Sequence, residues 1–251
     1  IENITEGSQL AQYLVDEAPN AAAKAIAERV LFNIKAIEQS GVPVKIEVLK
    51  GSKRKRWFGS SLPVSVGKKI QYFRVQFNGL NSKGKAETHP GSKDARAGMP
   101  TSRTPTGTRY STLMHELLHV ISQVQLDALI KRNFKGPEKE IYNELRSIYN
   151  AVKKQIEQDR KNLPREQWHP LINQVGSYYN GSILKDIHEL FVRALTEKDV
   201  QTYLSGVKMG KKSALTRLME IFRKVLGLDP EYQSALDRIM IVSEKIFAQT
   251  P

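Results

Sequence analysis

Residues 110–122 read Tyr-Ser-Thr-Leu-Met-His-Glu-Leu-Leu-His-Val-Ile-Ser. His115 and His119 are four positions apart, slightly more than one turn of an α-helix, so a helix would project both imidazoles from one face with Glu116 beside them. The other positions of 113–121 are apolar, which predicts a largely buried helix over about 108–131. Two unpaired histidines in a buried helix are costly to desolvate, and a shared metal ion would remove that cost.

These residue types suit zinc and a hydrolytic reaction. Neutral imidazole is a good zinc ligand, and a catalytic zinc keeps one position open for water. We expect Glu116 not to bind the metal; its carboxylate would take a proton from the water that zinc activates and later deliver it to a leaving amine. The chain has no cysteine, so every ligand must be His, Asp or Glu, which favours a catalytic over a structural zinc site.

Length and composition indicate a globular protein with a substantial core. The chain has 251 residues, of which 40% are hydrophobic, and no apolar run is long enough for a transmembrane helix. It begins with Ile1, and residues 1–20 lack the pattern of a signal peptide, so we expect an excised or processed piece of a longer protein.

A formal charge of +13 predicts attraction to polyanions without specifying which. The densest basic run is Lys53, Arg54, Lys55 and Arg56. One interpretation is a nucleic-acid contact in which the aromatic residues at 57 and 58 stack on bases. The other is a solvated loop after a strand, with the aromatic rings in the core, and this is the commoner outcome for a charge run.

Hydrophobic periodicity predicts an α+β fold. Apolar residues at helical spacing over 8–39 indicate one or two helices, and alternation over 42–49 and 70–77 indicates two strands before the 108–131 helix. Residues 78–108 are rich in Gly, Ser, Thr and Pro and are expected to be irregular. Further helices are expected over 138–162, 184–196, 199–207, 213–226 and 230–248.

We therefore predict a small, twisted, mostly antiparallel sheet packed on the 108–131 helix, followed by a mainly helical C-terminal half. The expected parts are an N-terminal helical segment over 1–40, a subdomain with the sheet and the His-Glu-x-x-His helix over 41–135, and a helical subdomain over 136–251 that carries the third metal ligand.

Two histidines hold zinc poorly, so a third ligand must come from elsewhere. Residues 120–131 contain neither Gly nor His, which excludes sites whose third histidine follows soon after the pair. The best candidate is Glu189, within the segment 186–195. His188 is an alternative, and Asp186 a weaker one. Because neighbouring side chains on a helix diverge by about 100°, only one of Glu189 and His188 can readily face the metal.

The two segments His-Glu-Leu-Leu-His at 115–119 and Glu-Leu-Phe-Val-Arg-Ala-Leu-Thr at 189–196 carry a family resemblance. The chain resembles gluzincin-type zincin metallopeptidase domains, in particular those within very large bacteriophage proteins and, distantly, the anthrax lethal factor catalytic domain. The resemblance covers about residues 40–250 in general order, but only these two motifs are specific. The long, charged interval between them departs from the pattern and leaves the register of the third ligand inferred. Glu189, Ala194 and Thr196 match the second motif, and Tyr203 matches the aromatic residue of the short helix that follows it in the family.

This resemblance implies a zinc metalloendopeptidase that binds Zn²⁺ through His115, His119 and Glu189 and uses Glu116 as its general base. It also implies a Tyr or His that donates a hydrogen bond to the oxyanion, for which Tyr179 and Tyr178 are the candidates; both could equally be packing residues.

The implied substrate is a protein, bound extended along a strand edge. The implied location is the virion, the host cytoplasm or both. An alternative function is a catalytically silent zincin-fold module of a virion protein that is ejected with DNA, and a third is a toxin-like protease directed at the host. The charge favours the module, whereas retention of Glu116 argues against it.

Overall fold

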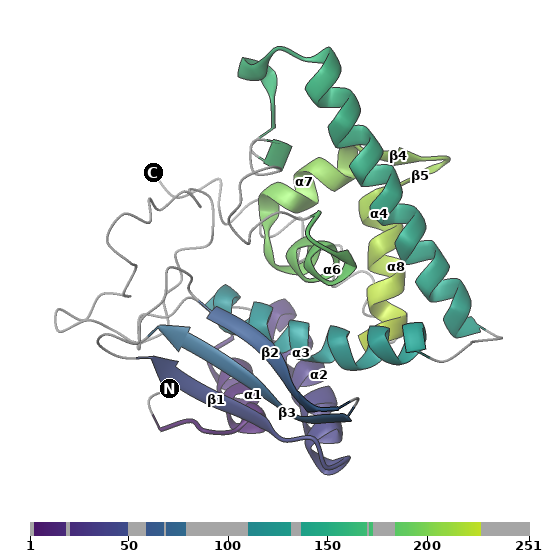
Figure 1. Cartoon of the computed structure of the whole chain (residues 1–251). Helices are drawn as coiled ribbons and strands as arrows, with labels where there is room; N and C mark the ends of the chain where they lie inside the picture. The colour runs from purple at the N-terminus through teal and green to yellow at the C-terminus, as the bar shows by residue number, and fades with distance from the viewer. Residues whose placement is uncertain are drawn as a thin grey trace, which may run out of the picture. The chain divides into compact units, whose positions relative to one another are not determined.

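The computed structural model describes residues 3–18, 21–49, 59–67, 69–78, 110–131, 137–169, 171–172 and 184–226 (Figure 1). Within these ranges the fold is α+β and mostly helical, with seven α-helices and a three-stranded sheet, which confirms the predicted class. The chain divides into two compact units, the first including residues up to Ile121 and the second beginning at Ser122. No helix in the described part of the chain combines the length and apolarity that crossing a membrane requires.

The first unit contains a mixed sheet in the order β1-β3-β2. Its strands are β1 (Val44–Leu49), β2 (Gly59–Val66) and β3 (Lys69–Asn78). β2 and β3 form an antiparallel hairpin that turns at Gly67, where φ is 61°, whereas β1 pairs in parallel with the other edge of β3. The sheet is therefore mixed rather than mostly antiparallel as predicted, because β1 pairs in parallel with β3 and not with β2, the strand that follows it in the sequence.

β2 was absent from the predicted strands, although β1 and β3 confirm the other two. Its sequence Gly-Ser-Ser-Leu-Pro-Val-Ser-Val contains residues that are rare in strands, and its burial does not alternate cleanly. Pro63 has no N–H to give to a neighbouring strand, which is tolerated because β2 lies at an edge of this sheet.

One face of the sheet forms the core of the first unit. Phe73, Val75 and Phe77 of β3 are fully buried, as period-two alternation requires. Helices α1 (Gly7–Asp16) and α2 (Ala21–Gln39) pack on each other and contact β1, and Figure 1 shows both on the same side of the sheet. They confirm the helices predicted over 8–39.

Helix α3 (Tyr110–Lys131) contains the His-Glu-x-x-His sequence. The Tyr110 hydroxyl donates a hydrogen bond of 2.9 Å to the backbone carbonyl of Leu14, which ties the start of α3 to α1. Leu113, Leu117 and Ile121 are completely buried, as the apolar sequence predicted. The division between the two units falls within α3, after Ile121.

The second unit is mainly helical, as predicted. Helix α4 buries a stripe that includes Leu145, Ile148 and Val152 and contacts α6 and α8. The rings of Phe191 and Phe222 pack against each other in a tilted arrangement, with centroids 4.1 Å apart, and join α6 to α8 in the core. The elements of this unit are α4 (Pro137–Asn162), η2 (Arg165–Gln167), α6 (Ile187–Thr196), α7 (Lys198–Gly206), β4 (Lys208–Met209), β5 (Lys212–Ser213) and α8 (Ala214–Leu226). The helix predicted over 230–248 lies outside the described residues.

Candidate metal centre

The two histidines of α3 face each other. Their Nε2 atoms are 3.1 Å apart, and the rings are nearly perpendicular, with centroids 4.7 Å apart. With Zn–N bonds of about 2.0–2.1 Å and a tetrahedral angle, two ligating nitrogens lie about 3.3–3.4 Å apart. The observed separation of His115 and His119 is close to that value. It also suits a hydrogen bond between the rings, which a shared metal ion would replace.

Helix α6 begins with a side-chain cap that fixes the position of Glu189. Asp186 is the N-cap residue, and its Oδ1 accepts a hydrogen bond of 2.8 Å from the Glu189 N–H. Glu189 is only 9% exposed, and burial raises the pKa of its carboxyl group. Lys185, whose Nζ lies 3.8 Å from Glu189 Oε1, and Arg193 act in the opposite direction and lower this pKa.

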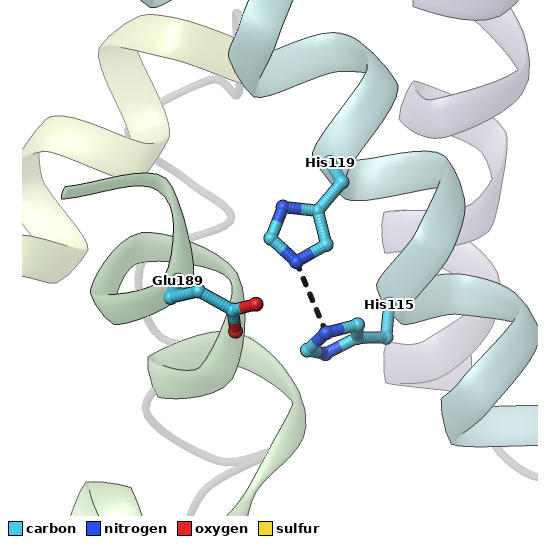
Figure 2. A group of neighbouring side chains, drawn as sticks. All are labelled: His115, His119 and Glu189. Carbon is cyan, nitrogen blue, oxygen red and sulfur yellow. Dashed lines mark hydrogen bonds between the residues drawn. The ribbon is translucent and has the colours of Figure 1, made fainter. Parts of the chain in front are cut away.

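His115, His119 and Glu189 could together hold a metal ion. Each offers one ligand atom, and these atoms lie within 4.8 Å of one another. Figure 2 shows the two imidazoles projecting from α3 and the Glu189 carboxylate directed toward them. The structure thus brings together the three residues proposed as ligands from the sequence.

The chemistry of this donor set fits a zinc ion. Two imidazole nitrogens and one carboxylate oxygen form a ligand set that catalytic zinc sites use, and it leaves a fourth position for water or substrate. His119 is 8% exposed and Glu189 is 9% exposed, so water solvates them little. A divalent cation would offset the cost of burying an ionised carboxylate at Glu189.

His188, the alternative third ligand, makes a different contact. Its Nδ1 lies 3.3 Å from the hydroxyl oxygen of Ser122, within the second unit. Ser122 is completely buried and follows His119 by three residues on α3. Asp186, the weaker alternative, directs one carboxylate oxygen to the N-cap bond of α6.

Glu116 lies against the first residue of β2. It is 6% exposed. A Cβ atom placed on Gly59 would be 2.8 Å from Glu116 Cγ and 2.9 Å from Oε1. The Glu116 carboxyl group therefore packs on the main chain of β2, next to two metal-ligand candidates on its own helix.

Several candidate residues lie outside the described part of the chain. They are the oxyanion candidates Tyr178 and Tyr179 and the basic run Lys53, Arg54, Lys55 and Arg56. Their predicted roles stay predictions.

Sequence reasoning missed three residues around the cluster. Arg193 follows Glu189 by four positions, and Ser122 follows His119 by three, so helical spacing placed each near its ligand. Gly59 left no comparable signal, because its strand was not predicted and its contact with Glu116 joins segments far apart in the sequence.

Comparison of this chain with models of protein families, with curated proteins and with solved structures finds no match in any of the three. The zincin resemblance thus rests on the two sequence motifs.

Proposed function

We propose that this chain is a zinc-dependent metallopeptidase that hydrolyses peptide bonds of a protein substrate. The observation that supports this most is the convergence of two imidazoles and a buried carboxylate, with a second buried carboxylate on the same helix as the imidazoles. A purely structural metal site needs the ligands but has no use for Glu116.

His115, His119 and Glu189 would hold the ion. When bound, zinc supplies Lewis acidity, which polarises a carbonyl group and lowers the pKa of water. Glu116 would accept a proton from the attacking water and return it to the amine that leaves when the peptide bond breaks. The burial of Glu116 suits this role, because bulk water has little access to its carboxylate and does not compete with the attacking water molecule.

The edge of β2 that faces away from β3 is the proposed binding site for the substrate backbone. The N–H of Phe73 donates to the carbonyl of Pro43, beside β1, so the main-chain groups of Phe73 and Val75 point toward β1. Those of Arg74 and Gln76 consequently point toward β2, because successive residues of a strand alternate.

This alternation fixes which groups of β2 are available. Ser60 and Leu62 lie opposite Gln76 and Arg74 and direct their main chains toward β3. Gly59, Ser61 and Pro63 direct theirs to the other edge, where no strand pairs with β2 in the part of the chain that the structure describes. Pro63 has no N–H and offers only its carbonyl there. The available main-chain groups are therefore the N–H and C=O of Gly59, the N–H and C=O of Ser61, and the C=O of Pro63.

An extended peptide could add to this edge by main-chain hydrogen bonds. Its backbone would then pass Gly59, whose Cα neighbours the Glu116 carboxyl group. Recognition through main-chain groups predicts a short extended segment of substrate, because the register of β2 shifts between Val64 and Ser65 and interrupts its regular edge.

The test combines zinc analysis with cleavage profiling. Wild-type protein and the Glu116→Gln variant are stripped with a chelator, reloaded with zinc, measured for metal content and incubated with a peptide library that is then analysed by mass spectrometry. We expect one zinc per chain in both proteins and cleavage only by the wild type, with a loss of at least about 10²-fold in the variant.

Glu166→Gln provides the matched control, because it makes the same change at an exposed residue of η2 and should cleave like the wild type. Zinc binding without Glu116-dependent cleavage would instead support a catalytically silent module. Failure of the wild type to bind zinc would contradict the proposed function altogether.

A further inference from the structure

Gly59 is the first residue of β2 and lies against the Glu116 side chain. The three heavy atoms nearest to a Cβ placed on Gly59 all belong to Glu116, at 2.8 Å (Cγ), 2.9 Å (Oε1) and 3.1 Å (Cδ). Real Cβ atoms essentially never approach another heavy atom within 3.0 Å. Any side chain at this position would therefore have to move the Glu116 carboxyl group.

The backbone of Gly59 does not itself require glycine. The described glycines with positive φ are Gly41, Gly67 and Gly210, so Gly59 has a conformation open to other residues. It lies in a β-strand, where glycine is unfavourable compared with residues that have side chains. The close approach of Glu116 is what the missing side chain accommodates.

From this contact we infer that Gly59 is the positioning residue for the Glu116 carboxylate. The inference rests on the proposed function, since it assigns Gly59 a role through the proposed base. Helix α3 is anchored by Leu113 and Leu117, both completely buried, so a clash at Gly59 displaces the Glu116 side chain while the helix stays in place. The three heavy atoms nearest to the new side chain all belong to Glu116 and not to the ligands His115 and His119.

The consequence is a selective effect on the chemical step. Displacing a catalytic group by about 1 Å can cost about 10²-fold in rate. Gly59→Ala keeps the main-chain N–H and C=O of β2, so binding of an extended substrate should be preserved. We therefore expect kcat to fall by about 10²-fold while KM and zinc content stay within about threefold of wild type.

The kinetic experiment compares wild type, Gly59→Ala and Gly206→Ala on a substrate found by the library screen. Gly206 is the matched control, because a Cβ there meets nothing within 4 Å and its φ is not positive. Wild-type kcat in Gly59→Ala would overturn the inference, as would loss of zinc, which would place the effect at the metal ligands.

A second experiment does not depend on turnover. Crystal structures of zinc-free wild type and Gly59→Ala are compared after superposition of α3. We expect the Glu116 carboxyl group to shift by about 1 Å or more, since the new Cβ must reach an ordinary contact distance. An unmoved carboxylate would overturn the inference whatever the kinetics show. An inactive wild type together with a displaced carboxylate would leave the packing role of Gly59 intact and contradict only the proposed function.

A folding defect in Gly59→Ala is separated from positioning by a second substitution. Glu116→Ala removes Cγ, Cδ and Oε1, the three atoms nearest to the new side chain. The double variant Gly59→Ala/Glu116→Ala should therefore have the thermal stability of Glu116→Ala alone. A double variant that still unfolds would show that the strand itself requires glycine and would overturn the inference.

Discussion

The Asp186 carboxylate accepts a hydrogen bond of 2.8 Å from the backbone N–H of Glu189, so the residue that donates the N-cap hydrogen bond of α6 is also the proposed third metal ligand. This bond satisfies one of the N–H groups that have no partner within the helix and sets the first turn. The same helix end carries a partial positive charge, which favours an ionised Glu189 and works against the effect of burial. Local helix chemistry and the proposed metal site are therefore linked at one residue.

Removing this cap should weaken both the helix and the metal site. We expect Asp186→Ala to lower the free energy of unfolding by about 1 kcal/mol, the usual cost of losing an N-cap, and to weaken zinc binding by about 10-fold. Asp186→Asn is the control, because Asn caps helices about as well as Asp. Urea denaturation of the zinc-free protein and a competition titration with a zinc chelator measure the two effects. Equal zinc affinity in Asp186→Ala and wild type would show that the cap does not position Glu189.

The identity of the third ligand can be tested with two neighbouring residues. Glu189→Gln removes a charged oxygen ligand and should weaken zinc binding by at least about 100-fold, more than the loss of a residue that only orients a ligand. His188→Ala breaks the contact with Ser122 and should change the affinity by less than about 10-fold. Isothermal titration calorimetry of both variants checks this. The reverse order of the two effects would make His188 the ligand.

The elements predicted correctly from the sequence are those with local patterns. The spacing of His115 and His119 placed both rings on one helical face, and the apolar residues between them predicted a buried helix; α3 has both properties. Glu189 was proposed from a short motif 70 positions further along the chain, and its carboxylate lies with the two rings in the structure.

What the sequence missed depends on contacts between distant segments. β2 does not alternate clearly, and hydrogen bonds along β3 stabilise it more than its own strand propensity does. The parallel pairing of β1 with β3 was missed for the same reason, because strand order is set by packing rather than by local sequence. The contact between Gly59 and Glu116 follows from that strand order and could not be predicted without β2.

The buried ion pair between Arg193 and Glu197 should contribute strongly to the stability of the second unit. Arg193 Nε and Nη2 donate to the two carboxylate oxygens of Glu197 at 2.8 and 2.6 Å, and both residues are buried. Glu197→Gln would remove the carboxylate that pairs with the buried Arg193 guanidinium, so we expect a loss of about 3–5 kcal/mol in the free energy of unfolding. Urea denaturation in the presence of a chelator measures this without a contribution from zinc.

Two further variants test whether the expected loss of stability comes from leaving a charge buried or simply from breaking an ion pair. Replacing both partners, in Arg193→Met/Glu197→Leu, should cost less than Glu197→Gln, because no buried charge remains. Glu220→Gln breaks the more exposed pair with Lys212 and should cost no more than about 1 kcal/mol. Similar losses of unfolding free energy in Glu197→Gln and Glu220→Gln would show that burial of the Arg193–Glu197 pair does not determine the cost.

His169 should make the second unit less stable in mild acid. Burial lowers its pKa, although Asp199 and Asp159 act in the opposite direction. In the unfolded chain His169 would titrate near 6.5, so as the pH falls below 6.5 the unfolded state takes up a proton before the folded state does, and stability decreases. His169→Asn does not titrate in this range, and its side-chain oxygen can replace Nδ1 as the acceptor for the Leu171 N–H. We expect the urea midpoint to drop more between pH 7 and pH 5 in the wild type than in His169→Asn, and equal drops would contradict this assignment.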